Sequence, residues 1–417
     1  MAEQSKRVII VGAGIIGVAA AVWLQREGHQ VVLLDRAGPA EGASFGNGGV
    51  LASASVVPVT TPGLWRKAPR MVLDPDSPLF LRWSYLPRML PWLARYLSHA
   101  NDRDVRRTAK ALYPIVGDSL ADHRALAAGT GAEKWISEAD FVYLYRSRRD
   151  YLADAYEWQF NRDYGFAPVE YEGDALRAYD PAFGDTMGFG AAMPNHGRIA
   201  DPGQYVKDLA THVEAQGGQM VIADVTGLIR DGGRVVGVHS STGDLRGDAV
   251  LIATGAWSGP MSKALGLKMP LETERGYHIE LWNPSVMPRS PVMMTTGSFV
   301  ITPMEGRLRL AGIVEFGGLT AGPSRAPFKL LMKQLKTAMP DLRWDQVTEW
   351  MGYRPTLTDS LPVIGAVPDL RGVYLGFGHQ HVGLTGGAKT GQLLAQMIAG
   401  KRPNIDMVPY DPGRFTG

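Results

Sequence analysis

Cysteine is absent from this chain of 417 residues. Without a thiol, the protein cannot form disulfides, iron–sulfur clusters, cysteine-ligated metal sites, a thiolate nucleophile or a flavin tethered through sulfur. An excess of charge of one sign is also missing, because 43 basic and 41 acidic residues leave a net charge of +2. This balance, without a long run of Lys and Arg, argues against a nucleic-acid partner.

Long apolar runs and metal-binding motifs are missing as well. No stretch of 18 apolar residues occurs, so we expect no membrane-spanning helix. The first residues, MAEQSKRVIIVGAG, lack the apolar stretch and cleavage site of a signal peptide. Together with the absence of cysteine, this favours a cytoplasmic protein. No H-E-x-x-H motif or cluster of acids at ligand spacing occurs, so we expect no metal.

Glycine, in contrast, is abundant, and its first cluster lies in a nucleotide fingerprint. Gly12, Gly14 and Gly17 form a G-x-G-x-x-G motif between an apolar strand and a helix rich in alanine. Gly12 permits the tight turn, Gly14 lets the backbone approach a pyrophosphate, and Gly17 lets the helix lie on the strand. Asp35 ends the next strand, where it can accept a hydrogen bond from a ribose hydroxyl and disfavours NADP. The segment predicts dinucleotide binding but does not separate NAD from FAD.

Two further glycine-rich segments extend this prediction. The loop EGASFGNGGV, residues 41–50, offers a hydroxyl, an amide and exposed backbone N–H groups to a ligand, although a solvent loop would have the same composition. Residues 376–387 place five glycines before the final helix, whose N-terminus attracts negative charge. A packing turn is the alternative interpretation of this second segment.

In their order along the chain, several motifs are similar to those of one family. These are GAGIIG (12–17), SFGNGG (44–49), IATGAWS (252–258), GYRP (352–355), DSLPVIG (359–365) and GFGH–x3–GLTGG (376–387). The chain resembles the FAD-dependent amine oxidoreductases of the D-amino-acid oxidase type over nearly its whole length. Among these, it is most similar to the bacterial D-amino-acid dehydrogenases.

The resemblance implies an α/β (α+β two-domain) fold. A Rossmann-like FAD-binding domain would comprise residues 1–60, 195–260 and 345–417. A discontinuous substrate-binding domain built on an antiparallel β-sheet would comprise residues 61–194 and 261–344. Runs such as DFVYLY (140–145) and RLRLAGIVEF (307–316) fit strands of that sheet.

The resemblance also implies which residues contact FAD. The front of the chain would hold the ADP half, and the turn before the last helix would hold the flavin ring, with N–H groups aimed at O2. Val225 would touch the adenine through its backbone. The predicted cofactor residues are Gly12, Gly14, Ile16, Gly17, Asp35, Arg36, Ser44, Asn47, Gly48, Gly49, Val225, Thr254, Gly255, Gly378, Gly383, Leu384 and Thr385.

Three side chains are predicted to serve the substrate. Arg354 offers a planar, permanently charged fork that suits the carboxylate of an α-amino acid. Tyr277 reads as a residue of the outer sheet, from which the family meets its substrates with a tyrosine, although a core tyrosine is equally compatible. His379 either lines the substrate side of the flavin or forms a hydrogen-bonded turn.

The resemblance implies oxidative deamination of D-amino acids, including cyclic ones such as D-proline or hydroxy-D-proline. Hydride transfer from Cα to flavin N5 would give an imine and then a keto acid, a reaction of amino-acid catabolism. The alternatives are an oxidase of glycine, sarcosine or another secondary amine, a flavin-binding electron-relay subunit of a heteromeric complex, and an NAD dehydrogenase. The last leaves the glycine-rich C-terminal helix unexplained.

An apolar arm, residues 78–100, stands apart from these motifs. It combines Trp83 and several leucines with Arg88 and Arg95, and its prolines predict a kink. Such an amphipathic arm can lie on a membrane surface, cover the active site or pack against the core. Contact with the periphery of the inner membrane would suit a quinone or a related compound as electron acceptor in preference to O2.

Overall fold

The computed structural model describes residues 5–183 and 186–415. Its first unit is a sheet of strand order β18-β19-β12-β1-β2-β8, in which the strands are parallel except for β18. The strands are β1 (Arg7–Val11), β2 (Gln30–Asp35), β8 (Gln219–Ile222), β12 (Ala249–Ile252), β18 (Val363–Ala366) and β19 (Val373–Phe377). The two central strands are apolar and buried on both faces, as expected for a parallel sheet covered on both sides.

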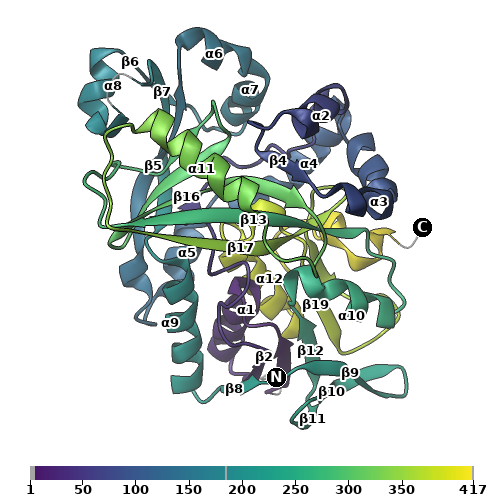
Figure 1. The fold of residues 1–417 in the computed structure, drawn as a ribbon. Helices are drawn as coiled ribbons and strands as arrows, with labels where there is room; N and C mark the ends of the chain where they lie inside the picture. Colours follow the sequence, from purple (N-terminus) through teal and green to yellow (C-terminus); the bar gives the residue numbers. More distant parts are fainter. Residues whose placement is uncertain (1–4, 184–185, 416–417) are drawn as a thin grey trace.

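Helices cover one face of this sheet and a small sheet covers the other (Figure 1). The helices are α1 (Ile15–Arg26), α4 (Asp102–Val116), α5 (Ser119–Ala127), α9 (Pro202–Ala215) and α12 (Gly387–Ile398). The small antiparallel sheet consists of β9 (Val225–Asp231), β10 (Arg234–Ser240) and β11 (Gly243–Arg246), and α10 (Ser258–Ala264) follows β12. The predicted Rossmann-like unit is therefore present.

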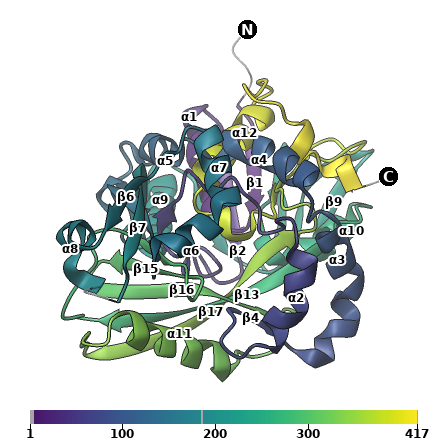
Figure 2. The same cartoon turned by 90° about the horizontal axis from the view of Figure 1, so that it is seen from above.

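A larger sheet forms the second unit, with the strand order β17-β13-β16-β15-β14-β5-β7-β3 (Figures 1 and 2). Helix α11 (Arg325–Ala338) packs on its outer face, and the Rossmann-like unit lies on its inner side. The strands are β3 (Val50–Leu51), β5 (Ile136–Tyr145), β7 (Phe189–Ile199), β13 (Leu271–Trp282), β14 (Val292–Met294), β15 (Phe299–Met304), β16 (Arg307–Phe316) and β17 (Gln346–Leu357). The runs predicted as strands at 140–145 and 307–316 are confirmed.

The remaining elements lie around the large sheet. They are α2 (Leu64–Leu73), β4 (Leu79–Leu81), α3 (Leu86–Ser98), α6 (Arg148–Ala153), α7 (Ala155–Asp163), β6 (Val169–Glu172) and α8 (Asp174–Tyr179). Strand β4 pairs with β16, and β6 pairs with β7. Short 3-10 turns include Gly255–Trp257 and Gln380–Val382.

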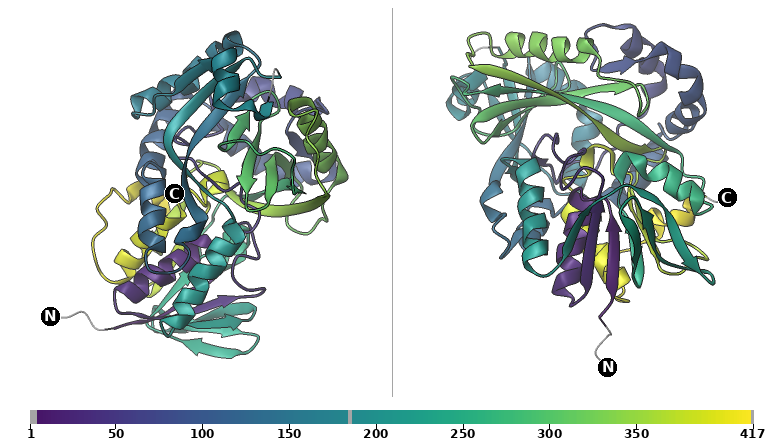
Figure 3. Two further views of the ribbon diagram at one scale, coloured as in Figure 1. Left: turned by 90° about the vertical axis from the view of Figure 1, so that its left-hand side faces the viewer. Right: turned by 60° about the horizontal axis from the view of Figure 1, so that its bottom comes forward.

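The first and last helices of the chain pack side by side (Figure 3). A Cβ atom on Gly387 would lie 2.6 Å from Cγ1 of Ile15, and one on Gly391 would lie 2.5 Å from Cβ of Ala19. Both contacts advance by four residues, so α1 and α12 run parallel and begin at the same edge of the sheet. That edge holds the carboxyl end of β1, directly before Gly12.

The apolar arm packs differently from its predicted pattern. Helix α3 begins at Leu86 and buries Met89, Trp92 and Tyr96 against Phe316. Trp83 and Leu90, which the sequence predicts to share one apolar face, are exposed. Helix α2 has no buried residue, so α2 and α3 form the rim of the molecule beside β4 (Figure 2).

Strand β17 bears on the predicted domain division. It pairs with β13 over its whole length, from Gln346 opposite Trp282 to Leu357 opposite Leu271. We propose that the last segment of the substrate-binding domain extends through β17 to Leu357 and does not end at residue 344, because β17 belongs to the large sheet and contributes to its inner face.

Candidate active site

The fingerprint glycines form the tight turn that the sequence predicts. Gly12 adopts φ +105°, and a Cβ atom on it would lie 2.4 Å from the carbonyl oxygen of Ala253. A Cβ atom on Gly17 would lie 2.0 Å from the carbonyl oxygen of Gly12. The turn therefore brings β1, α1 and the segment after β12 into backbone contact, and Thr254 and Gly255 follow directly.

The first turn of α1 retains the character of an anion site. Its N-cap is Gly14, which has no side chain to cover the free N–H groups, among them that of Ile16. Ser44 reaches this turn, since its Oγ accepts a hydrogen bond of 2.9 Å from the N–H of Ile15. The dipole of the helix favours a phosphate at this position.

Asp35 closes the same turn from the end of β2. Its carboxylate accepts hydrogen bonds of 2.9 Å from the N–H groups of Ala13 and Ala37. Its Oδ1 also accepts from the N–H of Gly38 at 3.3 Å, so the carboxylate is fixed beside the glycine turn and its Oδ2 keeps a lone pair for a hydroxyl donor.

We expect the variant Asp35→Ala to lose its dinucleotide more readily than the wild type. Removing a ribose partner and the anchor of the turn should weaken binding by about 10- to 100-fold, or ~1–3 kcal/mol. The measurement is the flavin absorbance that remains with the protein after dialysis. Asp248→Ala is the matched control, because Asp248 accepts a backbone hydrogen bond of 2.8 Å from Arg7 at the opposite edge of the same sheet. A fully loaded Asp35→Ala protein would contradict the ribose contact.

The buried side chain of Arg309 holds the loop of residues 44–49 in place, a contact that the sequence does not predict. Arg309 donates to the carbonyl oxygen of Phe45 at 3.1 Å and to that of Asn47. Arg309 is itself paired with Glu280 at 2.7 Å. Burial alone would raise the pKa of Glu280, but Arg309 and Arg307 lower it to about 2, so Glu280 is ionised at neutral pH.

The loop lies directly against the inner face of the large sheet. A Cβ atom on Gly46 would lie 1.9 Å from Cζ3 of Trp350, and the ring of His278 stacks on Trp350 at 5.0 Å. Gly49 has φ +73°, and its N–H donates to Oδ1 of Asn47 at 2.9 Å. The backbone of Gly48 is open, since an added Cβ atom would meet nothing within 4 Å.

Two predicted contacts to the ADP half lie farther from the glycines. Val225 begins β9, shortly after Ala223, whose N–H donates to the carbonyl oxygen of Asp35 at 3.0 Å. Arg36 stacks over the ring of Trp257 at 4.0 Å. Both positions are therefore at the end of β2, near Asp35.

The glycine-rich turn before α12 is fixed through its carbonyl groups. His123 of α5 contacts the carbonyl oxygen of Leu384 at 2.8 Å, and Ser119 donates to that of Thr385 at 2.7 Å. Because the N–H of a trans peptide points opposite to its C=O, the N–H of Thr385 points away from α5. The pKa of His123 is lowered to about 4 by burial, so the ring is neutral at pH 7. Gly378, with φ +90°, and Gly383 shape the preceding turn.

Arg354 lies on the inner face of β17. Its guanidinium occupies the space above Gly276, where a Cβ atom would lie 2.9 Å from Cζ of Arg354. Among the described residues it has no hydrogen-bond acceptor and no carboxylate within 4 Å. Burial lowers the pKa of Arg354, and Glu274 opposes this shift. The positive charge of Arg354 also acts to lower the pKa of His381, an exposed residue, so these side chains are close.

The structure does not bring the other two predicted substrate residues to Arg354. Tyr277 points to the outer face, where its hydroxyl donates to Glu315 at 2.6 Å and its ring contacts Phe328 of α11. His379 is buried, and its Nε2 lies 2.9 Å from Oγ1 of Thr390, so it ties the turn to α12. Burial lowers the pKa of His379 to about 3.

Instead, a row of side chains crosses the inner face of the large sheet. Register pairs link Tyr143, Met293, Val300, Ala311, His278 and Trp350 in succession. Tyr143, Met293 and Val300 are half-buried. The row is mostly apolar and lies beside Arg354, so the inner face combines one charged end with an apolar lining. The sequence shows which residues of each strand share a face. It does not show which of the two faces is the inner one.

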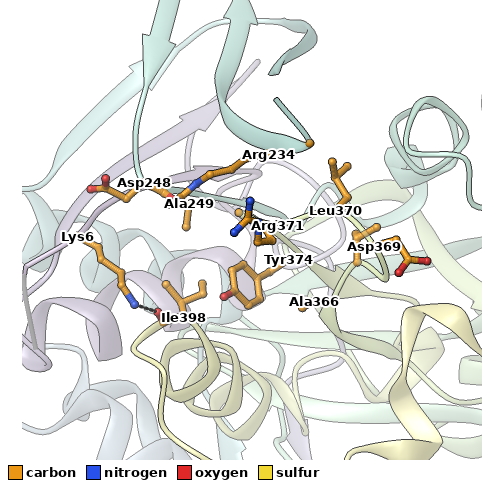
Figure 4. Close-up of a pocket in the computed structure, with 13 residues that line it drawn as sticks. Lys6, Arg234, Asp248, Ala249, Ala366, Asp369, Leu370, Arg371, Tyr374 and Ile398 are labelled. Carbon is orange, nitrogen blue, oxygen red and sulfur yellow. Dashed lines mark hydrogen bonds between the residues drawn. The ribbon is translucent and has the colours of Figure 1, made fainter. Parts of the chain in front are cut away.

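A cavity of about 710 Å³ opens at the other edge of the six-stranded sheet, among Lys6, Arg234, Arg371 and Tyr374 (Figure 4). Lys6 donates to the carbonyl oxygen of Ile398 there, at the end of α12. Because β1 begins at this edge and reaches Gly12 at the opposite one, the cavity is separate from the dinucleotide turn. Within the described part of the chain, no group of three or more His, Asp or Glu side chains could hold a metal ion.

Comparison with known proteins gives the family. Residues 7–397 match the family described as "DAO: FAD dependent oxidoreductase". A D-amino-acid oxidase from Bradyrhizobium diazoefficiens is 39% identical, with 99% of each chain covered. A D-amino acid dehydrogenase from Granulibacter bethesdensis is 29% identical, over 99% of this chain and 100% of that protein.

Solved structures share the fold. Glycine oxidase from Geobacillus kaustophilus has a TM-score of 0.79 at 21% identity, with 99% of this chain and 100% of the other covered. L-proline dehydrogenase from P. horikoshii has a TM-score of 0.76 at 16% identity, with 99% and 98% covered. At such identities the likeness concerns the fold alone. The chain thus belongs to the FAD-dependent oxidoreductases, and FAD is the dinucleotide that its family uses.

Proposed function

We propose that the protein catalyses the FAD-dependent oxidative deamination of D-amino acids. The observation that carries the proposal is Arg354, a half-buried guanidinium on the inner face of the sheet without a protein partner among the described residues. An uncompensated buried charge is costly unless a ligand completes it, and a carboxylate matches its planar fork. The names of relatives that are 39% and 29% identical support an amino acid of D configuration as substrate.

The residues of the chain would supply binding and orientation. FAD, when bound, accepts a hydride from the substrate at N5. The glycine turn, Asp35 and Ser44 would hold its ADP half, and the turn at Leu384 and Thr385 would face its ring. Arg354 would pair with the carboxylate of the substrate and so present Cα in a fixed orientation, while the inner face of the sheet excludes water. The imine product then reacts with water to give a keto acid and ammonia.

The apolar row that crosses the inner face of the large sheet supports a substrate with an apolar side chain. Tyr143, Met293 and Val300 present half-buried apolar surface on the same face. A cyclic amino acid such as D-proline would bury such surface, whereas glycine has no side chain to use it. An electron-relay subunit would not need a carboxylate anchor, which disfavours that alternative.

Anaerobic bleaching of the flavin tests the reaction directly. D- and L-amino acids are added singly to the purified yellow protein, and the loss of flavin absorbance is followed. We expect D-amino acids with apolar or cyclic side chains to bleach the flavin and their L-enantiomers to leave it oxidised. Bleaching by L-amino acids alone, or by none, would refute the proposal.

We further propose that the reduced protein passes its electrons to a quinone or a related acceptor in preference to O2, at the periphery of a membrane. The support is the arm of α2 and α3, where Trp65, Leu73, Trp83 and Leu90 are exposed. Exposed basic residues surround them: Arg66, Lys67, Arg70, Arg88 and Arg95. Apolar and basic side chains on one rim suit anionic lipid. No helix within the described residues is long and apolar enough to cross a membrane.

Sedimentation with vesicles that contain phosphatidylglycerol tests this contact. We expect the wild type to pellet with them, and the double variant Trp83→Glu/Leu90→Glu to remain in the supernatant, because charge at the interface opposes insertion. Leu152→Glu is the matched control, since Leu152 is 59% exposed on α6, outside the arm. A wild type that never pellets excludes the membrane contact, and faster re-oxidation by air than by a soluble quinone excludes the acceptor.

A further inference from the structure

A buried acid, Glu274, faces the half-buried Arg354. Glu274 lies directly opposite Arg354 in the register of β13 and β17, so both side chains stand on the inner face of the sheet. On its other side Glu274 pairs with Phe316 of β16, and the residue is only 8% exposed. The strand fixes this position, since Gly276 follows on the same face and leaves room for the guanidinium.

The two opposite charges do not neutralise each other by direct contact. No nitrogen of Arg354 lies within 4 Å of a carboxylate oxygen of any described residue, Glu274 included. Burial raises the pKa of Glu274 above its ordinary value, and the charge of Arg354 and the neighbouring hydroxyl of Thr356 oppose this shift only in part. Nearby, the hydroxyl groups of Thr356 and Ser360 are buried without a hydrogen bond of normal length. The cluster therefore has unused hydrogen-bonding capacity on both the acidic and the basic side.

The groups around this pair do not replace either charge. Tyr96 of α3 lies near Glu274, and burial raises the pKa of its hydroxyl above the ordinary value, so the hydroxyl stays neutral. His381 is exposed, and the positive charge of Arg354 disfavours a second cation there, so His381 adds no charge to the pair. Glu272, the next acid on the same face, is engaged by the hydroxyl of Tyr85, which lies 3.0 Å from both carboxylate oxygens.

We propose that Glu274 binds the α-ammonium group of the substrate while Arg354 binds its α-carboxylate. An amino acid carries both charges on one carbon, so a single zwitterion can meet two opposite charges that stand on neighbouring strands. This inference rests on the proposed function and sharpens it: the site recognises the amino acid by both charges, and a carboxylic acid without the amine meets Glu274 as a repelling neighbour.

Product release follows from the same arrangement. The keto acid keeps its carboxylate, which Arg354 still balances, but it has lost the ammonium group and therefore leaves Glu274 without a cationic partner. In a buried site such an uncompensated charge is costly. The product should therefore bind more weakly than the amino acid from which it forms.

The variant Glu274→Gln tests the proposal with two ligands, for which we expect the substitution to have opposite effects on binding. The first is the D-amino acid that bleaches the flavin most readily, and the second is the same molecule without its amino group, used as an inhibitor. We expect kcat/KM for the amino acid to fall about 100-fold, because the ammonium loses its charged partner. We expect the inhibition constant of the carboxylic acid to decrease at least about fivefold, because the repelling charge is gone.

If the amino acid reacts less efficiently while the carboxylic acid binds more tightly, Glu274 recognises the ligand and does not have a structural role alone. If Glu274 only positioned Arg354, amino acid and carboxylic acid would weaken together, and that outcome overturns the proposal, as does an unchanged variant. Glu272→Gln is the matched control and should alter neither value. A fully active Arg354→Leu protein would contradict the proposed function itself. If Arg354→Leu is inactive but Glu274→Gln is unaffected, only the inference about Glu274 is wrong.

Discussion

Replacing Arg354 with leucine should leave a yellow, folded protein that no longer oxidises amino acids. The flavin contacts proposed here come from the turns at the edge of the six-stranded sheet, whereas Arg354 belongs to β17 of the large sheet. The carboxylate of the substrate would then enter a buried site without its partner. Loss of one member of such a charge pair costs about 4 kcal/mol, which corresponds to roughly a 1,000-fold fall in kcat/KM.

The measurement compares kcat/KM with the flavin absorbance of the same preparation, so that loss of cofactor is not mistaken for loss of chemistry. Arg325→Leu is the matched control, because the Arg325 side chain is 70% exposed on α11 and pairs with Glu349 at the surface. Exposed ion pairs contribute little, so this variant should keep full activity. An Arg354→Leu protein with unchanged kcat/KM would remove Arg354 from the substrate site.

The Rossmann-like part of the fold could be predicted because its signals are local. Gly12 and Gly17 are required by backbone atoms 2.4 and 2.0 Å from where their Cβ atoms would be, and the strands beside them are continuous apolar runs. The packing of the arm could not be predicted in this way. The leucines of residues 83–97 share a helical face, but the groove formed by β13 and Phe316 accepts Met89, Trp92 and Tyr96 instead. A periodic pattern identifies an apolar face, while the neighbouring element decides which face is buried.

The candidate site shows the same limit. Arg354 could be singled out from its motif, because an arginine is an unusual residue on a buried strand. The sequence places Tyr277 on the correct strand. Because side chains alternate between the two faces of a sheet, the sequence alone does not tell which face packs against α11. Glu274 and Arg309 belong to runs of alternating charge, with Glu272 on β13 and Arg307 on β16. Arg275 and Glu315 are charged, buried and paired as well, but they lie with Tyr277 on the outer face, so charge alone does not identify the inner face.

The contact between α1 and α12, at the two ends of the chain, predicts the largest effect of a substitution on stability. Gly391 of α12 packs on α1, where a Cβ atom would lie 2.5 Å from Cβ of Ala19 and 2.7 Å from the N of Ala20. The second of these atoms is backbone and cannot move aside as a flexible side chain would. A leucine at position 391 must therefore push α12 away from α1, and overpacking of this kind costs about 3 kcal/mol or more.

The displacement should also reach the cofactor. Helix α12 begins four residues before Gly391, directly after the turn of Leu384 and Thr385, and α1 begins at the fingerprint glycines. If one FAD molecule spans both helix N-termini, Gly391→Leu should lower the melting temperature by about 5 °C or more and also reduce the flavin content of the purified protein. Gln392→Leu is the matched control, because it adds a leucine one residue farther along α12 at a half-buried position. A Gly391→Leu protein that melts at a lower temperature yet retains its full flavin content would mean that the two ends of the chain pack together without sharing the cofactor.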